Sequence, residues 1–462
     1  MQRFLLVLLI LGLFRPVSAA AFNLPAPLRG EAESLIAAAQ KSDQGYAIIE
    51  SLTTEIGPRL AGSPQEARAR DWAVAKLEEL GFTQVRVEPF QVEGWERHRE
   101  TAAIVSPFPQ PLVVTALGHS RGTPPEGVTG EVVRFSSLDA LKAYSSESDA
   151  LAGKIVFVDE PMTRTQDGSG YGVAVAKRGQ SAVEGRKRGA IAALIRSVGT
   201  QHHRMPHTGS MGYGEAAQSL PSAALSAPDA DQLARALQHG PVTVRLTLET
   251  GLIGPSPSGN VIADIPGTDL ADEIVLIGAH LDSWDLGTGA IDDGAGVGIV
   301  TAAARLIMDQ GKAPRRTIRV VLFGSEEVGL RGARAYAEAH AAELPKHFAA
   351  AESDFGADVI WRLDSGVPET KLPLVDAVHA VLKPLGISRG GNETTGGPDI
   401  GPMAAGGAHA FELQQDGWDY FDLHHTPDDT LDKVDPVKVR QNVATYAAFA
   451  WLMANVDDVT NP

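Results

Sequence analysis

The sequence predicts an α/β fold in which a mixed, mostly parallel sheet is flanked by helices and interrupted by a smaller α+β insert. Two observations support this. Residues 273–329 show strand, loop, helix and strand patterns in that order, as in a parallel sheet. The composition also changes near Pro107, where Pro and Gly cluster and short strand patterns follow. We therefore expect 21–126 and 250–462 to form one main domain around an insert at 127–249.

The first part of the main domain is predicted to be largely helical. Helical patterns cover residues 30–41 and 43–56. A third helix should begin at Ser63, a residue type suited to cap a helix, with a proline in the first turn. That helix should stop at Gly81. Alternating apolar residues then predict a strand over 85–92.

The insert is predicted to alternate short strands with helices around a small core of its own. One of its loops contains three histidines: His202, His203 and His207. They could form a metal site, but no carboxylate lies at a fixed spacing from them, so a polar, exposed loop is the preferred interpretation. The predicted strands are 130–134, 154–159, 190–197, 221–226 and 242–248, and the helices are 181–189 and 229–239.

The second part of the main domain follows a Gly-, Pro- and Ser-rich segment at 251–259, which we interpret as a linker. Asp435 is suited to cap a long C-terminal helix that includes 437–456. Strands and helices are expected to alternate between these two points. The strands are 261–265, 273–279, 318–323, 348–353 and 408–413, and the helices are 294–308, 330–342 and 373–385.

Imidazoles and carboxylates gather where these strands end. Because the carboxyl ends of parallel strands meet at one edge, a single site can contain them all. So many carboxylates repel one another unless a multivalent cation compensates their charge. Oxygen and nitrogen donors without sulfur suit zinc, with Mn and Co as alternatives. Two histidines and three acids suffice for two metals if one acid bridges. The candidate residues are His280, Asp292, Glu326, Glu327, Asp354 and His425.

Two pairs of residues that lie close together in the sequence are expected to have different roles within each pair. Glu326 and Glu327 point in different directions at a strand end, so one can bind metal while the other takes a proton from water. Asp282 lies two residues after His280 and is expected to orient its ring through a hydrogen bond to the other nitrogen. Each motif alone is a weak signal, and the prediction depends on their combination.

Several motifs resemble the co-catalytic zinc aminopeptidase/glutamate carboxypeptidase family. They are GAHLDSWDLGTGAIDDGAG, FGSEEVGL, ESDFG and HHTPDDT. The GPRLAGS turn that starts at Gly57 resembles the plasma glutamate carboxypeptidase (carboxypeptidase Q) branch. The insert resembles a protease-associated domain. The similarity extends over nearly the whole mature chain, although animal members of the branch carry cysteines and this chain has none.

The resemblance implies a set of metal ligands. His280 and Asp354 would share one zinc ion. Glu327 and His425 would share a second, and Asp292 would bridge both.

It also implies the residues that act on the substrate. Glu326 would be the general base, Asp282 the acid behind a metal-bound histidine, and His424 the group that steadies the tetrahedral oxyanion. His424 and His425 are adjacent, so they could exchange roles. Asp293 is a second candidate for the bridge.

The function implied is that of a di-zinc exopeptidase that hydrolyses short peptides, such as dipeptides with free termini. A water between the metals would lose a proton to Glu326, attack the peptide carbonyl, and the proton would pass to the leaving amine. The preferred terminus stays open. The alternatives are a strict aminopeptidase, an amidohydrolase or acyltransferase, and a non-catalytic binding ectodomain. The complete set of ligands and Glu326 argue against the last. The resemblance also implies a homodimer.

The N-terminus predicts export. Arg3 is followed by an apolar run at 4–14 and by small residues, which is typical of a signal peptide over residues 1–20, cleaved near Ala19 or Ala20. The run is too short to span a bilayer, so no membrane anchor is expected after cleavage. We expect a secreted or periplasmic protein.

The composition excludes several classes of function. The 462-residue chain contains no cysteine, which rules out thiol catalysis, disulfides and Cys-type zinc sites. Its hydrophobic fraction of 44% and charged fraction of 21% are ordinary for a globular protein. A net charge of -17 at pH 7 without basic tracts makes nucleic acids and anionic membranes poor candidates as partners.

Overall fold

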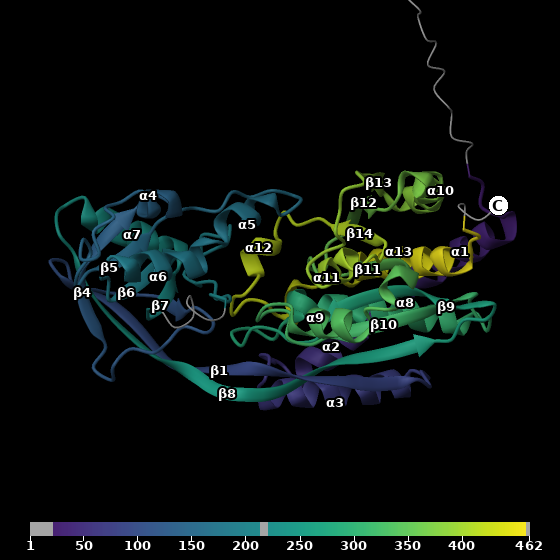
Figure 1. Ribbon diagram of the computed structural model, residues 1–462, viewed down its shortest axis with the longest axis horizontal. Helices are drawn as coiled ribbons and strands as arrows, with labels where there is room; N and C mark the ends of the chain where they lie inside the picture. Colours follow the sequence, from purple (N-terminus) through teal and green to yellow (C-terminus); the bar gives the residue numbers. More distant parts are fainter. Residues whose placement is uncertain (1–21, 213–219, 459–462) are drawn as a thin grey trace, which may run out of the picture.

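A computed structural model describes residues 22–212 and 220–458, so the predicted signal peptide lies outside the described residues. One continuous sheet runs through the described chain (Figure 1). Two strands lie outside the main strand order given next: β1 (Val85–Ser106) pairs with β8 and with β2 (Gln110–Leu112). The order is β13 (Ser388–Arg389), β12 (Ile360–Gly366), β14 (Ala410–Gln415), β11 (His347–Glu352), β9 (Leu270–His280), β10 (Arg316–Phe323), β8 (Thr243–Ile265), β4 (Val128–Phe135), β5 (Ile155–Val158), β6 (Ala192–Arg196), β7 (Ser222–Leu225) and β3 (Val114–Ala116).

The sheet is mixed and consists of two parts, each built around a group of parallel strands. In the main part, β9 runs parallel to both β10 and β11, and β11 runs parallel to β14. In the second part, β4, β5, β6 and β7 are successively parallel. The antiparallel pairs of β8 with β10 and with β4 join the two parts. This arrangement confirms the predicted α/β class.

Helices cover both faces of the main part of the sheet, because its central strands are apolar on both sides. Val275 and Ile277 of β9 pack into the core on one face, and Ile274 and Leu276 pack into the core on the other. The first face is covered by α1 (Ala26–Ala39), α2 (Gln44–Glu55), α8 (Ala295–Asp309) and α13 (Pro436–Asn455), and the second by α9 (Arg331–Ala339) and α11 (Gly401–Ala405).

The two predicted helix caps form as expected. The Ser63 hydroxyl accepts a hydrogen bond from the Glu66 amide at 3.1 Å and begins α3 (Pro64–Glu79), which packs on β1 and β8. The Asp435 carboxylate accepts one from the Val437 amide at 2.8 Å and begins α13. These bonds satisfy amides that the first helical turn leaves without a partner.

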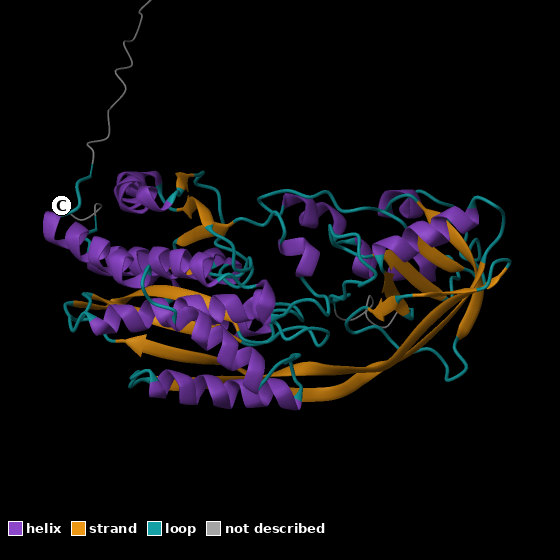
Figure 2. Ribbon diagram, turned by 180° about the vertical axis from the view of Figure 1, so that it is seen from behind, coloured by secondary structure: helices purple, strands orange, loops and turns teal. Residues whose placement is uncertain are grey.

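The predicted linker at 251–259 is wrong. These residues belong to β8, which is continuous and pairs with β1 along most of its length. The two strands form a long ribbon that runs along the lower edge of the molecule and joins its two ends (Figures 1 and 2). Between the two parts β8 pairs only with β1, so Pro255 and Pro257, two apart, can direct their ring nitrogens to the open side. The turn-like composition therefore reflects a partly exposed ribbon.

Residues from the predicted insert gather at the end of the molecule opposite α1 and α13 (Figure 1). There, Phe157, Leu194 and Leu246 contribute to one buried cluster. In the described part of this region, the helices beside β4–β7 are α4 (Leu138–Lys142), α5 (Ser169–Ala174), α6 (Lys177–Lys187) and α7 (Ala227–Leu237). Within residues 22–212 and 220–458, no helix is both long and apolar enough to cross a membrane.

We expect the protein to lose stability in mild acid, partly through His347. This side chain is fully buried, with Nε2 2.9 Å from the Tyr336 hydroxyl and Nδ1 3.1 Å from the Glu343 carbonyl oxygen. Burial lowers the pKa of His347 to about 4. Between about pH 6.5 and pH 4 the unfolded chain binds a proton at this histidine that the folded chain excludes, so stability falls with pH, by up to about 3 kcal/mol.

Urea unfolding of wild type and His347→Gln between pH 7.5 and 4 tests this expectation. The variant should show a shallower loss of stability below pH 6.5. His203→Gln, a change at an exposed histidine, should keep the wild-type slope. Equal slopes for His347→Gln and wild type would contradict the prediction.

Candidate metal centre

The main part of the sheet brings the predicted residues to one edge. His280 is the last residue of β9, and Glu326 and Glu327 follow β10. Asp354 follows β11, and Asp292 lies in the tight turn that leads into α8. Because β9 is parallel to both β10 and β11, with Phe323 opposite His280, these ends lie next to each other. The late loop with His424 and His425 follows the short helix α12 (Tyr420–Leu423).

One group of donors forms around His280. Its Nε2 lies 3.0 Å from Asp292 Oδ1 and 3.3 Å from Asp354 Oδ1. These atoms are close enough together to share one cation. Burial alone lowers the pKa of His280, but Asp354 and the other nearby acids raise it well above its ordinary value. The imidazole is thus surrounded by negative charge.

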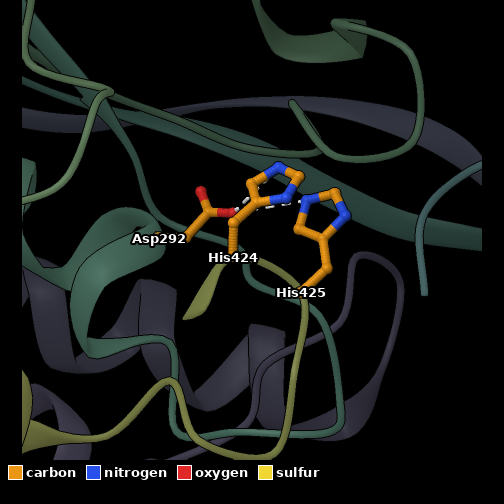
Figure 3. A group of neighbouring side chains, drawn as sticks. All are labelled: Asp292, His424 and His425. Carbon is orange, nitrogen blue, oxygen red and sulfur yellow. Dashed lines mark ion pairs between the residues drawn. The ribbon is translucent and has the colours of Figure 1, made fainter. Parts of the chain in front are cut away.

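A second group forms around His425. Its Nε2 lies 2.9 Å from Glu327 Oε2 and 3.3 Å from Asp292 Oδ2. His424 also faces Asp292, with Nε2 3.7 Å from Oδ2, and Figure 3 shows both rings pointing toward that carboxylate. The two rings stack with centroids 3.4 Å apart. Asp292 therefore contributes one oxygen to each of the two groups.

Asp282 connects His280 to the loop with the two glutamates. The predicted hydrogen bond from the Asp282 carboxylate to the His280 ring does not form: Oδ1 is 3.7 Å from Nδ1, whereas the backbone carbonyl of Asp282 is 2.9 Å away. The carboxylate instead accepts a hydrogen bond from the Glu326 amide at 3.0 Å. The carbonyl of Asp282 therefore orients the His280 ring, and its carboxylate holds the backbone at Glu326.

Asp293 is occupied by backbone amides. Its Oδ2 accepts from the His280 amide at 3.1 Å and its Oδ1 from the Gly296 amide at 2.8 Å. A Cβ on Gly296 would lie within 2.5 Å of both Asp293 oxygens, so only glycine permits this approach. Of the two adjacent aspartates, Asp292 is therefore the one with oxygens facing the histidines.

The donor set fits a multivalent cation. Asp292 Oδ2 and Glu327 Oε1 are buried and lack hydrogen-bond partners among the described residues. Burial and nearby acids raise the pKa of both Glu326 and Glu327 well above the usual value for glutamate. Buried carboxylates in such a cluster are costly without positive charge. Imidazole and carboxylate donors without sulfur match zinc chemistry.

Two residues that the sequence did not single out hold the loop before α8. Asp429 accepts hydrogen bonds from the amides of Ile291 and Asp292, at 2.6 and 3.3 Å. Burial raises the pKa of Asp429 to about 7. The fully buried Arg59, from the GPRLAGS turn, donates to the carbonyls of Leu281, Thr288 and Gly289 in the same loop, at 2.5 to 2.9 Å. Asp429 therefore positions Asp292 through its backbone amide, and Arg59 holds the loop that precedes it.

Residues of α5 and α6 also line the candidate metal centre. A cavity of about 520 Å³ lies over the donors, and Tyr171 of α5 and Arg178 of α6 line it together with the ligands. The Tyr171 ring stacks on Phe421 and meets His424 edge-on, with centroids 4.9 and 5.2 Å apart. The volume is typical of a pocket for a small ligand.

The loop with the three earlier histidines is only partly exposed. His202 and His203 are exposed, as expected, but His207 is buried because its Nδ1 bonds to the His424 carbonyl oxygen at 2.6 Å. Neither group of potential metal donors within residues 22–212 and 220–458 includes any of the three. His207 thus braces the loop that presents His424 and His425.

Comparisons with known proteins identify the family of this chain. The model of peptidase family M28 matches residues 260–450. Human carboxypeptidase Q is 33% identical over 418 residues, which cover 90% of this chain and 86% of the human protein. The crystal structure of a peptidase M28 precursor from Shewanella amazonensis SB2B has 51% identity and a TM-score of 0.91, covering 94% of this chain and 98% of its own. A zinc aminopeptidase from Bacillus subtilis shares the fold, with a TM-score of 0.66 at 20% identity and coverage of 90% and 95%.

The family match and the relatives show that the protein is a zinc metallopeptidase, a class for which buried imidazoles and carboxylates at a sheet edge are suitable ligands. The relatives that match along almost the whole chain refine this assignment. The chain belongs to peptidase family M28, which confirms the resemblance seen in the motifs.

Proposed function

We propose that the protein is a di-zinc exopeptidase that hydrolyses short peptides. One observation supports this above all: the two oxygens of Asp292 face different histidines, His280 and His425, at 3.0 and 3.3 Å. A carboxylate in this place can bridge two ions. His280 and Asp354 would hold one zinc, and His425 and Glu327 the other. When bound, two zinc ions activate water and stabilise the oxyanion.

Glu326 is proposed as the general base. Its carboxyl lines the cavity beside the donors, and burial raises its pKa well above the usual range. It takes a proton from the attacking water and returns it to the leaving amine. Asp282 fixes this glutamate by accepting its amide hydrogen bond. His424, whose Nδ1 is buried without a partner among the described residues, is proposed to steady the oxyanion.

Three further properties belong to the same proposal. Residues 1–20 are proposed to direct secretion or export to the periplasm. Residues 127–249 are proposed to form an inserted, protease-associated-like domain, with 21–126 and 250–462 as the catalytic domain. The chain is proposed to form a homodimer. Human carboxypeptidase Q, a relative over 90% of this chain, favours peptides as the substrate class. The alternatives are a strict aminopeptidase, an amidohydrolase or acyltransferase, and a binding ectodomain.

A dipeptide panel tests the proposed activity. Purified protein loaded with zinc should hydrolyse unblocked dipeptides, and removal of the metal with a chelator should abolish hydrolysis. Readdition of zinc should restore it. Peptides blocked at either terminus will identify the end that is recognised. Protein that holds two zinc ions and cleaves no peptide would refute the peptidase proposal and favour the amidohydrolase or the binding protein.

A further inference from the structure

Arg178 is a buried cation without an anionic partner. It belongs to α6, it is only 4% exposed, and it lines the cavity above the metal donors. None of the ion pairs among the described residues involves it, and its Nε lacks a hydrogen-bond partner there. Burying a guanidinium without a counter-charge is unfavourable, so the site is poised to receive an anion.

The contacts that Arg178 makes leave one edge of its guanidinium free. Nη1 donates to the Tyr171 hydroxyl at 2.6 Å. Nη2 lies 3.3 Å from His425 Nδ1, but that nitrogen carries a proton when Nε2 faces a metal, and it can donate to the Thr208 carbonyl at 3.3 Å. Nε and Nη2, which share one edge, then have no acceptor. Such an edge matches the two oxygens of a carboxylate.

The surroundings of Arg178 restrict what can bind there. It is the only arginine or lysine among the described residues that line the cavity. The main chain at Gly209 packs against the guanidinium, and a Cβ there would lie 2.3 Å from Cζ. The plane of the side chain is therefore held in place. The other charged groups in the described wall are mainly acids that repel an anion: Asp167, Glu352 and Glu412.

We propose that Arg178 binds the free α-carboxylate of the residue on the leaving side of the scissile bond. This inference rests on the proposed peptidase function. Arg178 Nη2 lies 3.3 Å from the ring of His425, a proposed zinc ligand, so the free edge lies beside the metal donors, within reach of a single substrate residue. A carboxylate at that distance belongs to the residue directly after the scissile bond.

The test compares a dipeptide with its C-terminal amide. Zinc-loaded wild type should hydrolyse the free acid with a kcat/KM roughly 100-fold higher, as for a charged hydrogen bond of about 3 kcal/mol. Arg178→Gln should lower kcat/KM for the free acid much more than for the amide, so that the preference for the free acid is lost. Arg178→Lys should be intermediate. Arg188→Gln is the matched control, a buried arginine at the end of the same helix that bonds Glu184 and lies outside the described cavity wall.

The outcomes separate the two proposals. Wild-type protein that cleaves neither substrate would refute the proposed function. Wild-type protein that cleaves both equally well, or an Arg178→Gln effect of equal size on both, would refute the carboxylate site and assign Arg178 a role in supporting His425. Zinc content and thermal unfolding show whether each variant is folded. If Arg178→Gln does not fold, the wild-type preference and the lysine variant decide.

Discussion

Replacing Glu326 with glutamine is expected to reduce kcat on dipeptides by roughly 100- to 10,000-fold, the usual contribution of a general base. Glutamine keeps the shape of the side chain but cannot accept the proton of the attacking water. The donors around Asp292 do not include Glu326, so both zinc ions should stay bound. KM should change little, because substrate binding does not need the proton transfer.

Steady-state kinetics together with zinc analysis of the purified variant measure this effect. Glu412→Gln is a useful control, since this glutamate lines the cavity but bonds Thr394 at 2.6 Å. It should retain most of the activity. A Glu326→Gln variant with two zinc ions and wild-type kcat would show that another group accepts the proton.

Replacing Asp292 with asparagine is expected to remove both zinc ions, whereas Glu327→Gln should weaken only one. The Asp292 oxygens face both His280 and His425, whereas Glu327 pairs with His425 and not with His280 among the described ion pairs. Hydrolysis should fall below detection in Asp292→Asn. The stabilisation by zinc should disappear as well, which for a wild-type site at 100 times Kd amounts to about 2.7 kcal/mol.

Metal analysis and thermal unfolding with and without zinc measure these losses. Asp293→Asn tests the rival bridge, because its carboxylate bonds the amides of His280 and Gly296. That variant should lose stability but retain zinc. Two bound zinc ions in Asp292→Asn, or their loss in Asp293→Asn, would overturn the proposed bridge.

Local signals in the sequence predicted much of the fold. The caps at Ser63 and Asp435 are chemical signals that act within one helical turn, and both form. The apolar run at 273–279 predicted a strand, and it forms within β9. Strand ends that carry His280 and Glu326 indicated the edge where the site lies, because parallel neighbours end together.

Features that depend on distant partners were not predictable. The strand β12 contains charged and polar residues, and it forms because β14 supplies its antiparallel partner. The ribbon residues at 251–259 have the composition of a linker and become a strand only beside β1. Asp429 and Arg178 meet the centre from segments far from β9, so no spacing along the chain relates them to the donors.

The β1–β8 ribbon also has a consequence for how the chain folds. Ser106 pairs with Thr243, and Val85 pairs with Ala263. Pairing of the two strands therefore closes a loop that contains residues 107–242. Closing such a loop costs entropy early and is repaid only when both strands are in register. Chains with many such distant pairings fold slowly. Since β8 continues into the pairing with β10, the sheet edge that presents the donors depends on this closure.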